Sequence, residues 1–493
     1  MKKAIPGKYK AFSSKKKIGG VNVRKTKIVA TIGPASESEE NIVKLLECGV
    51  NVFRLNSSHE TIEIHRERIK RLKKVREKGY QFAILLDLAG PKIRTGKFET
   101  DYVTLEDGKE VEIVCGEEFI GNAQRFWINY DKLYEEIKPG EKILINDGAV
   151  SLTVKDVDKS RKAILCVIER GGTITHKRGV NLPGVDISIP SVTDRDKEFI
   201  KLGNEERIDY FALSFVRKAK DVEDAKSLTD IPIVAKIETA QALNNLEEIV
   251  IKADAVMVAR GDLGVEIPVA QVPIAQKRII EVANLYKKPV ITATQMLESM
   301  INSATPTRAE VTDISNAILD GTDAVMLSAE TSIGKYPCEA VQVMDEVAKN
   351  TESFMEEYEA FRLDWLKEYS SSLDLPSAIS YAATNLAKNI DAKLIITATG
   401  TGTTAIHVSK YKPSIPIMAA TNSYETFCRL SLVWGVVPVM LEKSLTTDEM
   451  IEEVTKKAKE LGFVQPGDKV VIVAGIPWGK PGTTNTVQVQ EIK

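Results

Sequence analysis

IPIVAKIETAQALNNLEEIVIKADAVMVARGD, at residues 231–262, is the stretch that decides the fold of this chain. It contains two short apolar runs, IPIVA and AVMVA, and charged residues follow each of them at once. Continuous apolar runs of this length are typical of parallel strands buried on both faces, because a solvent-exposed face would require alternating polar residues. The stretch therefore predicts two parallel strands that end in polar residues.

The same pattern occurs in about eight runs between Lys27 and Glu330. Most of them are followed by amphipathic stretches that predict helices, for example at 39–47, 62–77, 269–286 and 307–319. Eight such β/α units close into a TIM barrel. The eight runs are KIVATIG, NVFRLNSS, FAILLDLAG, YFALSFV, IPIVAKIE, AVMVARGD, PVITATQ and AVMLSAE.

Two further regions lie outside this repeat. More than 100 residues separate the third and fourth runs, and their short strands and turn signals (EDGKE, KPGEK, NDGAV) predict a small all-β insertion that could act as a lid. Beyond Pro376 the runs KLIITAT, IPIMAAT, VVPVML and KVVIVAG predict a C-terminal α/β domain, with a helix before it from Pro337 to Tyr358. We predict an N-terminal arm at 1–23, the barrel at 24–90 and 183–345, a β-barrel lid at 91–182, and the α/β domain at 346–493.

The composition is that of an ordinary globular protein. The 493 residues are 43% hydrophobic, and 67 Lys and Arg nearly balance 69 Asp and Glu, which disfavours a dominant role in binding nucleic acid. The 5 Cys form no CxxC pair, which argues against a zinc ribbon and suits a reducing compartment. No apolar run reaches the roughly 18 residues of a membrane span, so we expect a cytoplasmic protein. The basic first segment is more typical of a solvated arm than of a transit peptide.

Barrel active sites lie at the carboxyl ends of the strands, so the polar residues that close each run are the candidates. Glu238 and Asp262 close neighbouring runs and offer oxygen ligands for Mg²⁺. Lys236 lies two residues before Glu238, so both side chains point to the same face of a strand. The other candidates at strand ends are Arg54, Asn56, Ser58, His59, Asp87, Lys92, Arg94, Arg260, Gly261, Thr294, Gln295, Ser328 and Glu330.

Several cations, a divalent-metal site and the lack of an obvious Cys/His or Ser/His nucleophile favour phosphoryl transfer, in which positioning and charge stabilisation do most of the work. There is no GxxxxGK[ST] motif, so a nucleotide must be bound in another way. Taken singly, each charged residue could instead belong to a structural ion pair. Together, on the strand ends of one barrel, they favour an active site.

Eleven motifs follow one another along the chain: TKIVATIGPAS, FRLNSSH, DLAGPKIRTG, NDGAVSL, KRGVNLPG, SFVRKAKDV, AKIET, VARGDLGVEIP, TATQMLESM, PTRAEVTD and MLSAET. They resemble the motifs of the pyruvate kinases, and the likeness runs from about Arg24 to the C-terminus. The resemblance implies domains A, B and C, with B as the lid, and transfer of a phosphoryl group from phosphoenolpyruvate to ADP to give pyruvate and ATP, the last step of glycolysis. It also implies a homotetramer.

The resemblance assigns roles by motif. Lys236 would stabilise the transferred phosphoryl group, Arg54 would contact it, and Glu238 and Asp262 would bind Mg²⁺ or Mn²⁺. The substrate carboxylate would be held by Ala259, Gly261, Asp262 and Thr294. Thr294, Ser328 and Glu330 would relay the proton to the enolate. The residues expected to face the nucleotide are Asn56, His59, Arg94, Lys177 and Arg178.

One departure from the family concerns a monovalent ion. Many members carry DTKGPEIRT and require K⁺ at positions that correspond to Asn56, Ser58, Asp87 and the carbonyl of the next residue, which is Leu88 here. In this chain Lys92 replaces the Glu of that motif. A fixed ammonium group near the pocket could supply the charge that K⁺ otherwise brings, so we expect activity that does not need K⁺. The alternative is that Lys92 points into solvent.

In the C-terminal domain, TGTGTT resembles the family's effector loop, in which hydroxyl and backbone N–H groups bind phosphate. Its GxGxxA spacing is only a weak match to a dinucleotide motif. We expect a sugar phosphate or AMP to bind here as an allosteric activator. The alternative is that the loop is an ordinary helix cap that binds no effector. The residues are Thr399, Gly400, Thr401, Gly402, Thr403, Thr404, Trp478, Lys480, Gly482 and Thr483.

Two other functions fit the sequence less well than the kinase. Another Mg²⁺-dependent barrel enzyme of phosphoenolpyruvate or pyruvate is less favoured, because a phosphohistidine enzyme would require a carrier domain that the sequence does not show. A non-catalytic phosphometabolite sensor would not need the intact set of Lys236, Glu238, Asp262 and Thr294.

Overall fold

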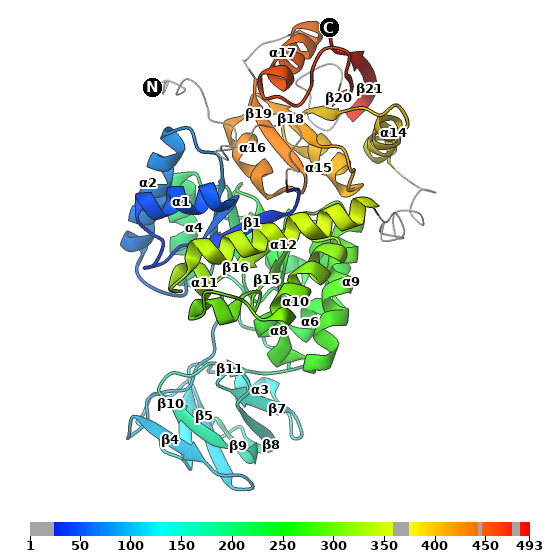
Figure 1. Ribbon diagram of the computed structural model, residues 1–493. Coiled ribbons are helices and arrows are strands. Elements are labelled where there is room, and N and C mark those ends of the chain that lie inside the picture. The colour runs from blue at the N-terminus through cyan, green and yellow to red at the C-terminus, as the bar shows by residue number, and fades with distance from the viewer. Residues whose placement is uncertain (1–23, 358–373, 442–445, 476–483) are drawn as a thin grey trace.

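The computed structural model describes residues 24–357, 374–441, 446–475 and 484–493 (Figure 1). The N-terminal arm therefore lies outside the described residues. So do four of the predicted effector residues: Trp478, Lys480, Gly482 and Thr483.

Eight parallel strands form a closed barrel, as the sequence predicts. Each of the eight apolar runs supplies one strand, and the order around the barrel is β1-β16-β15-β14-β13-β12-β3-β2. The strands are β1 (Lys27–Thr31), β2 (Val52–Asn56), β3 (Ala83–Asp87), β12 (Tyr210–Leu213), β13 (Ile233–Ile237), β14 (Ala255–Ala259), β15 (Val290–Ala293) and β16 (Ala324–Leu327).

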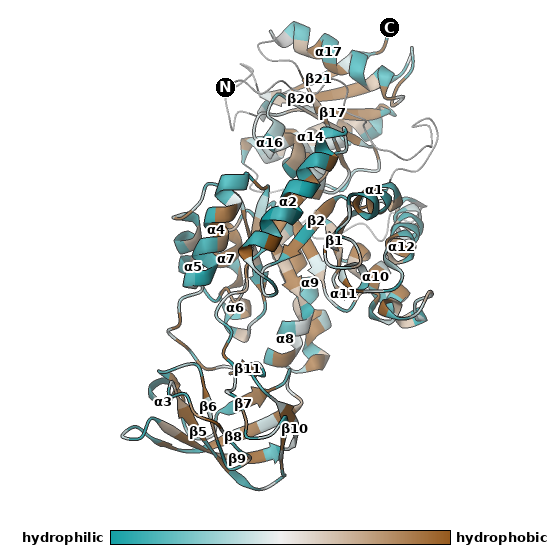
Figure 2. Cartoon of the chain, turned by 90° about the vertical axis from the view of Figure 1, so that its left-hand side faces the viewer, coloured by the Kyte–Doolittle hydropathy of each residue, from teal (hydrophilic) through white to brown (hydrophobic). Residues whose placement is uncertain are grey.

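Two layers of side chains explain why these runs are continuously apolar. One face of each strand fills the barrel interior, as Val29, Val234 and Met257 do. The other face packs under the surrounding helices, whose outward sides are hydrophilic (Figure 2). These helices are α1 (Glu39–Cys48), α2 (Ile62–Glu77), α4 (Asp194–Glu206), α5 (Ala219–Lys226), α6 (Ala240–Asn244), α7 (Leu246–Lys252), α9 (Val272–Leu285), α10 (Arg308–Leu319) and α12 (Pro337–Glu357).

The predicted helix boundaries agree with the structure where capping signals are strong. Thr307 caps α10 through a reciprocal pair of bonds with Glu310, and Ser38 caps α1. The predicted helix at 269–286 is divided into a 3₁₀ turn, η1 (Val269–Gln271), and α9. Short helical turns also follow three of the strands: α8 (Arg260–Glu266), η2 (Glu298–Ile301) and α11 (Ala329–Ser332).

The segment between β3 and α4 forms a separate body at one end of the barrel, joined to it by two linkers (Figure 1). We predicted a β-barrel here; the described strands form a six-stranded sheet in the order β11-β7-β8-β9-β5-β6 and a separate two-stranded sheet of β10 and β4. Its elements are β4 (Tyr102–Leu105), β5 (Glu110–Cys115), β6 (Arg125–Ile128), α3 (Leu133–Glu136), β7 (Lys142–Ile145), β8 (Val150–Asp158), β9 (Ala163–Arg170), β10 (Gly172–Thr175) and β11 (Val180–Asn181).

The C-terminal region forms a five-stranded sheet in the order β19-β18-β17-β20-β21. The four predicted strands are parallel, and the last strand, β21, which we did not predict, runs antiparallel along β20. The elements are α14 (Leu375–Asn389), β17 (Leu394–Ala398), α15 (Thr403–Lys410), β18 (Ile417–Thr421), α16 (Tyr424–Arg429), η5 (Leu430–Leu432), β19 (Val436–Met440), α17 (Thr447–Glu460), β20 (Lys469–Gly475) and β21 (Thr484–Glu491).

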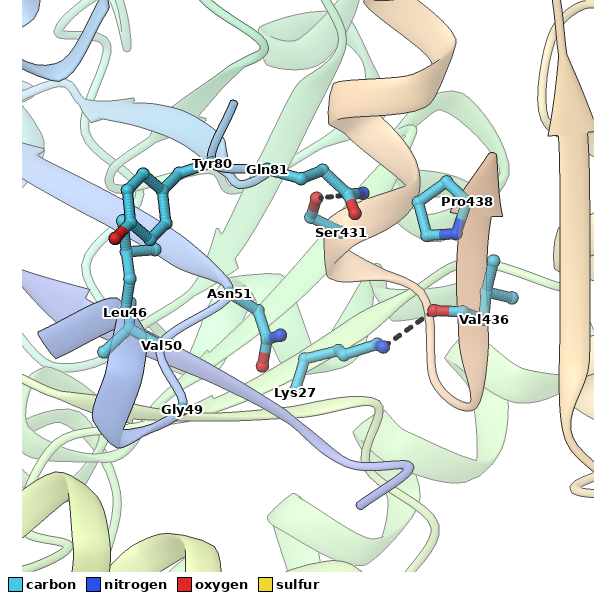
Figure 3. A pocket seen from close by; sticks show the side chains of 10 residues that line it. All are labelled: Lys27, Leu46, Gly49, Val50, Asn51, Tyr80, Gln81, Ser431, Val436 and Pro438. Atoms are coloured by element: carbon cyan, nitrogen blue, oxygen red, sulfur yellow. Dashed lines mark hydrogen bonds between the residues drawn. The ribbon is translucent and has the colours of Figure 1, made fainter. Parts of the chain in front are cut away.

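The C-terminal sheet region packs on the amino end of the barrel, opposite the lid (Figure 1). Leu432 of η5 joins the core inside the barrel, and Lys410 of α15 forms a buried ion pair with Asp323, which precedes β16. A cavity of about 50 Å³ lies in this interface, where the Lys27 ammonium group donates to the Val436 carbonyl oxygen at 2.8 Å (Figure 3). No helix within the described ranges is long and apolar enough to span a membrane.

Candidate active site

The polar residues at the carboxyl ends of the barrel strands converge on Lys236, which lies on β13. Its Nζ is 2.8 Å from Glu238 Oε1 and 3.3 Å from Asp87 Oδ1, and it donates to Ser214 Oγ at 2.7 Å. The side chain is buried, so these partners replace the water that would otherwise solvate the ammonium group. The structure therefore holds a fixed positive charge at the strand ends.

Arg54 contributes a second cation beside the first. Parallel pairing of β2 with β3 aligns Asn56 with Asp87, so the Arg54 side chain reaches the same carboxylate as Lys236. Its Nε donates to Asp87 Oδ2 at 2.7 Å and its Nη1 donates to Thr31 Oγ1 at 3.0 Å. Asp87 thus holds both cations in position.

Charge pairing fixes the protonation states of this cluster. Burial alone would raise the pKa of Asp87, but Lys236 and Arg54 outweigh it and hold that pKa below the usual value. Burial opposes the charged form of Lys236, yet Asp87 and Glu238 raise its pKa above the usual value. Near neutral pH the lysine is therefore an ammonium ion and Asp87 a carboxylate.

Glu238 and Asp262 could hold a divalent cation. Glu238 follows β13, is buried, and accepts a hydrogen bond from the Phe215 N–H at 2.7 Å. Burial raises its pKa, and the nearby Asp262 carboxylate adds to the rise. Two carboxylates that repel each other in a partly buried site fit a divalent ion, which would relieve the repulsion. Within the described ranges no cluster of three or more His, Cys, Asp or Glu offers a fuller site, so substrate and water oxygens would complete the coordination.

Thr294 lies in a strained turn directly after β15. Its φ of 69° is unusual for a β-branched residue, and the turn is held by Arg260, whose Nη2 donates to the Thr294 carbonyl oxygen at 2.5 Å. Arg260 is itself fixed by Asp313 at 2.7 Å. The Thr294 hydroxyl accepts from the Gly261 N–H at 2.8 Å, which brings together two residues predicted to hold the substrate carboxylate. Ala259, at the end of β14, pairs across the sheet with Ala293, the residue before Thr294.

Glu330 and Ser328 lie beyond β16. The Glu330 carboxylate accepts from the backbone N–H of Ser328 at 2.7 Å and of Leu297 at 3.2 Å. Burial raises the pKa of Glu330. The side chain therefore ties the loops after β15 and β16 together, and its predicted part in a proton relay stays a prediction.

A cleft of about 550 Å³ opens between the lid and the barrel mouth. Four of the five residues predicted to face a nucleotide line it: His59, Arg94, Lys177 and Arg178. The fifth, Asn56, is instead bonded through its side chain to the Ser58 N–H at 3.1 Å. Partial burial, together with Lys92 and Arg94, lowers the pKa of His59, which favours its neutral form. The cleft is rich in cations, as binding of phosphate groups requires.

The residues of the expected monovalent site lie at the carboxyl ends of the paired strands β2 and β3 and directly after them. Leu88 is buried, and the backbone N–H of Ser57 donates to the Asp87 carbonyl oxygen. Lys92 is exposed and lines the cleft close enough to His59 to lower the pKa of that histidine. Whether its ammonium group replaces K⁺ stays a prediction.

The predicted effector loop lies at the start of α15. Gly402 has a φ of 92° and its N–H donates to Thr399 Oγ1 at 2.9 Å, while the hydroxyls of Thr401 and Thr403 are 2.9 Å apart. The Gly400 carbonyl oxygen accepts from Thr426. Thr404 contacts Thr484, the first described residue after the segment that holds the other predicted effector residues.

Three residues of the active site were missed from the sequence. Ser214 binds the Lys236 ammonium group, Phe215 binds Glu238 through its N–H, and Glu266 lines the cleft, where burial raises its pKa to about 7. Ser214 closes the fourth apolar run, so its position gave the same signal as the chosen residues. The sequence carried no comparable signal for the Phe215 backbone, which depends on an uncommon φ of 54°.

The fold and this cluster define a barrel phosphotransferase with an inserted lid. Two family models match the chain: the pyruvate kinase barrel domain at residues 23–341 and the pyruvate kinase alpha/beta domain at residues 377–490. The chain belongs to the pyruvate kinase family, and it is an enzyme of that family.

Individual relatives agree over nearly the whole chain. A pyruvate kinase of Thermotoga maritima is 48% identical over 95% of this chain and all of its own length, and one of Clostridium acetobutylicum is 42% identical over 96% of this chain and all of its own length. A crystal structure of a pyruvate kinase from Cryptosporidium parvum superposes with a TM-score of 0.89 at 34% identity, covering 95% of this chain and 96% of the other.

Proposed function

We propose that this enzyme transfers the phosphoryl group of phosphoenolpyruvate to ADP, with Mg²⁺ or Mn²⁺ as the divalent ion. The observation that carries the proposal is the buried contact of Lys236 with Asp87, Glu238 and Ser214, beside Arg54. Two fixed cations next to a carboxylate pair suit a reaction in which charge moves between oxygen atoms while a phosphoryl group is in transit.

In this reaction the bond between phosphorus and the enol oxygen breaks and a bond to a β-phosphate oxygen of ADP forms. Lys236 and Arg54 stabilise the negative charge on the phosphoryl oxygens, and Asp87 orients both cations. A divalent ion held by Glu238 and Asp262 would neutralise charge on the substrate oxygens. The enolate that remains takes a proton at its terminal carbon and becomes pyruvate.

The turn of Gly261 and Thr294 would position the substrate carboxylate for that step. Backbone N–H groups at the start of α8, together with the Ala259 and Asp262 segment, form a surface suited to an anion. Thr294 would pass a proton to the enolate, with Ser328 and Glu330 completing the relay. Arg260 keeps the Thr294 turn in place through its contacts with the carbonyl and with Asp313.

The lid would close over ADP. His59 on the barrel side and Arg94, Lys177 and Arg178 on the lid side line the cleft, so closure would surround the phosphates with cations. It would also exclude water, which could otherwise accept the phosphoryl group.

We further propose that the activity does not require K⁺, because Lys92 carries a positive charge that acts on His59, which is close in the chain to Asn56 and Ser58. In a buffer free of K⁺, Na⁺ and NH₄⁺, the wild-type enzyme should turn over at close to its rate in K⁺. Lys92→Glu should become dependent on K⁺, whereas a Lys252→Glu control on the barrel surface should not. Full dependence of the wild type on K⁺ would overturn this part.

The α15 loop supports a proposal of allosteric activation by a sugar phosphate or AMP, because Gly402, Thr401 and Thr403 present backbone and hydroxyl groups at a helix start. We also propose the domain boundaries stated above, a homotetramer and a cytoplasmic location. The test titrates each phosphate compound into the wild type, into Thr403→Val and into the control Thr455→Val. An activator should lower KM for phosphoenolpyruvate in the wild type and in Thr455→Val, but not in Thr403→Val.

The test of the main proposal is a coupled assay of pyruvate formation from phosphoenolpyruvate, ADP and Mg²⁺. Turnover supports the kinase. Binding of phosphometabolites without any turnover would favour the sensor, and consumption of phosphoenolpyruvate without ADP would favour another barrel enzyme of the same substrate.

A further inference from the structure

Two of the five cysteines meet on the outside of the barrel. Cys48 is the last residue of α1, and Cys338 lies in the first turn of α12. The two thiols lie close enough for each to shift the pKa of the other, and both are only partly buried. Gln342, one turn after Cys338 on the same face of α12, donates to Cys48 Sγ at 3.6 Å. Cys48 therefore lies against the face of α12 that carries Cys338 and Gln342.

The surroundings favour reaction at Cys338. The neighbouring Cys48 thiol lowers the pKa of Cys338 to about 7, while the Cys48 pKa is raised. Lys44 on α1 favours the thiolate and Glu339 on α12 opposes it. The start of the 21-residue helix α12 adds its favourable dipole. The pair thus consists of one nucleophilic thiol and one neighbour positioned to resolve it.

The other three cysteines offer an internal comparison. Cys115, Cys166 and Cys428 are buried, and burial raises the pKa of each thiol. A buried thiol of raised pKa is largely unreactive at neutral pH. Oxidation confined to Cys48 and Cys338 could therefore be distinguished from general oxidation of all five cysteines.

We propose that Cys48 and Cys338 are a reversible oxidation site, at which a hydroperoxide converts the two thiols into a disulfide between α1 and α12. The Cys338 thiolate attacks the peroxide, an S–O bond forms, the O–O bond breaks, and the displaced oxygen leaves as water or alcohol after protonation. The Cys48 sulfur then attacks the sulfenic sulfur, and its proton leaves with the hydroxyl group as water. The peroxide is reduced by the same two electrons that the thiols lose, and a dithiol reductant reverses the change.

The disulfide would link the first turn of α12 covalently to α1. The other end of α12 is already anchored, because the Glu352 carboxylate accepts from the backbone N–H groups of Lys25 and Thr26 at 2.8 and 2.6 Å. A cross-link between residues so far apart in the chain restricts the unfolded state strongly. We expect the oxidised enzyme to unfold at a temperature higher by about 5 °C.

The test treats the full-length enzyme with a small excess of hydrogen peroxide at neutral pH and maps its peptides without reduction. We expect one cross-linked peptide pair containing Cys48 and Cys338, with Cys115, Cys166 and Cys428 still free, and its loss after dithiothreitol. In Cys48→Ser the resolving thiol is absent, so Cys338 should instead accumulate as sulfinic acid. Cys428→Ser is the matched control and should still form the cross-link.

Three results would overturn the proposal. The first is oxidation of Cys338 in the wild type with Cys48 still reduced. The second is equal oxidation of the three buried cysteines in the folded enzyme. The third is a cross-linked enzyme whose unfolding temperature does not rise, since that would contradict the fastening of α12.

Discussion

Lys236 and Glu238 lie two residues apart in the chain, and their side chains meet at 2.8 Å between Nζ and Oε1. The residue between them, Ile237, points to the opposite face of the strand and is buried under the helices. The alternation of a β-strand therefore places the cation proposed to bind the phosphoryl group next to one carboxylate of the proposed metal site. Replacing either residue should therefore change the position and the pKa of the other side chain.

Lys236→Met should lower kcat by more than about 10³-fold, because methionine keeps most of the length of the side chain but removes the charge proposed to face the transferring group. Steady-state kinetics with circular dichroism as a check of folding would measure this. Lys252→Met, on the barrel surface, should leave kcat within about twofold. A folded Lys236→Met enzyme with wild-type turnover would remove Lys236 from the mechanism.

Thr294→Val should lower kcat by about 10- to 100-fold, because valine fills the same space but gives Gly261 N–H no acceptor and the substrate no hydroxyl. Thr294→Ser retains the hydroxyl and is the matched control, with a loss of only a few fold. The comparison uses kcat and KM for phosphoenolpyruvate. Equal losses in the two variants would show that the turn geometry, rather than the hydroxyl, is what matters.

Arg217 anchors the return linker of the lid, which we define as residues 183–192. Its buried guanidinium group donates to the carbonyl oxygens of Ile187 at 2.6 Å and Ile189 at 2.5 Å. The segment 214–217 therefore contains Ser214 and Phe215, which bind Lys236 and Glu238, as well as Arg217, which binds the return linker.

Arg217→Gln should raise the rate of proteolysis within the return linker and raise KM for ADP more than KM for phosphoenolpyruvate, since we propose that the nucleotide binds under the lid. Limited proteolysis and both KM values would test this. Arg125→Gln, on an exposed part of the lid, serves as the control. Unchanged cleavage together with unchanged KM values would mean that the linker is held in another way.

Lys27 should make stability depend on pH. Burial lowers its pKa to about 7, and its ammonium group donates to the Val436 carbonyl oxygen in the interface with the C-terminal domain (Figure 3). Between about pH 7 and its unfolded value near 10.4, the unfolded chain binds more protons than the folded one, so this residue makes stability rise with pH.

Lys27→Met should remove this contribution. The free energy of unfolding of the wild type, relative to the variant, should increase by about 1 kcal/mol per pH unit between pH 7 and 9. Urea unfolding at three pH values would measure it, with Lys252→Met as the control. Parallel pH profiles for the wild type and Lys27→Met would contradict the lowered pKa.

The barrel was predictable because each strand is buried on both faces, so runs such as AVMVA are apolar throughout. Lys236, Glu238 and Arg54 could be chosen because strand ends in a barrel meet at one place. The role of Phe215 could not be predicted, because it depends on a positive φ. The role of Arg260 could not be predicted either, because it depends on a contact with the Thr294 carbonyl oxygen across the barrel mouth. The antiparallel β21 was missed because its exposed polar face weakens the apolar signal, and the contact of Cys48 with Cys338 depends on the packing of helices far apart in the chain.

The most direct test of the central claim is to quantify pyruvate and ATP together in one reaction of the wild-type enzyme with phosphoenolpyruvate, ADP and Mg²⁺. Transfer at the Lys236 site predicts equal amounts of the two products at every time point. Pyruvate without ATP would mean that water takes the phosphoryl group, and the absence of both products would contradict the assignment of the site.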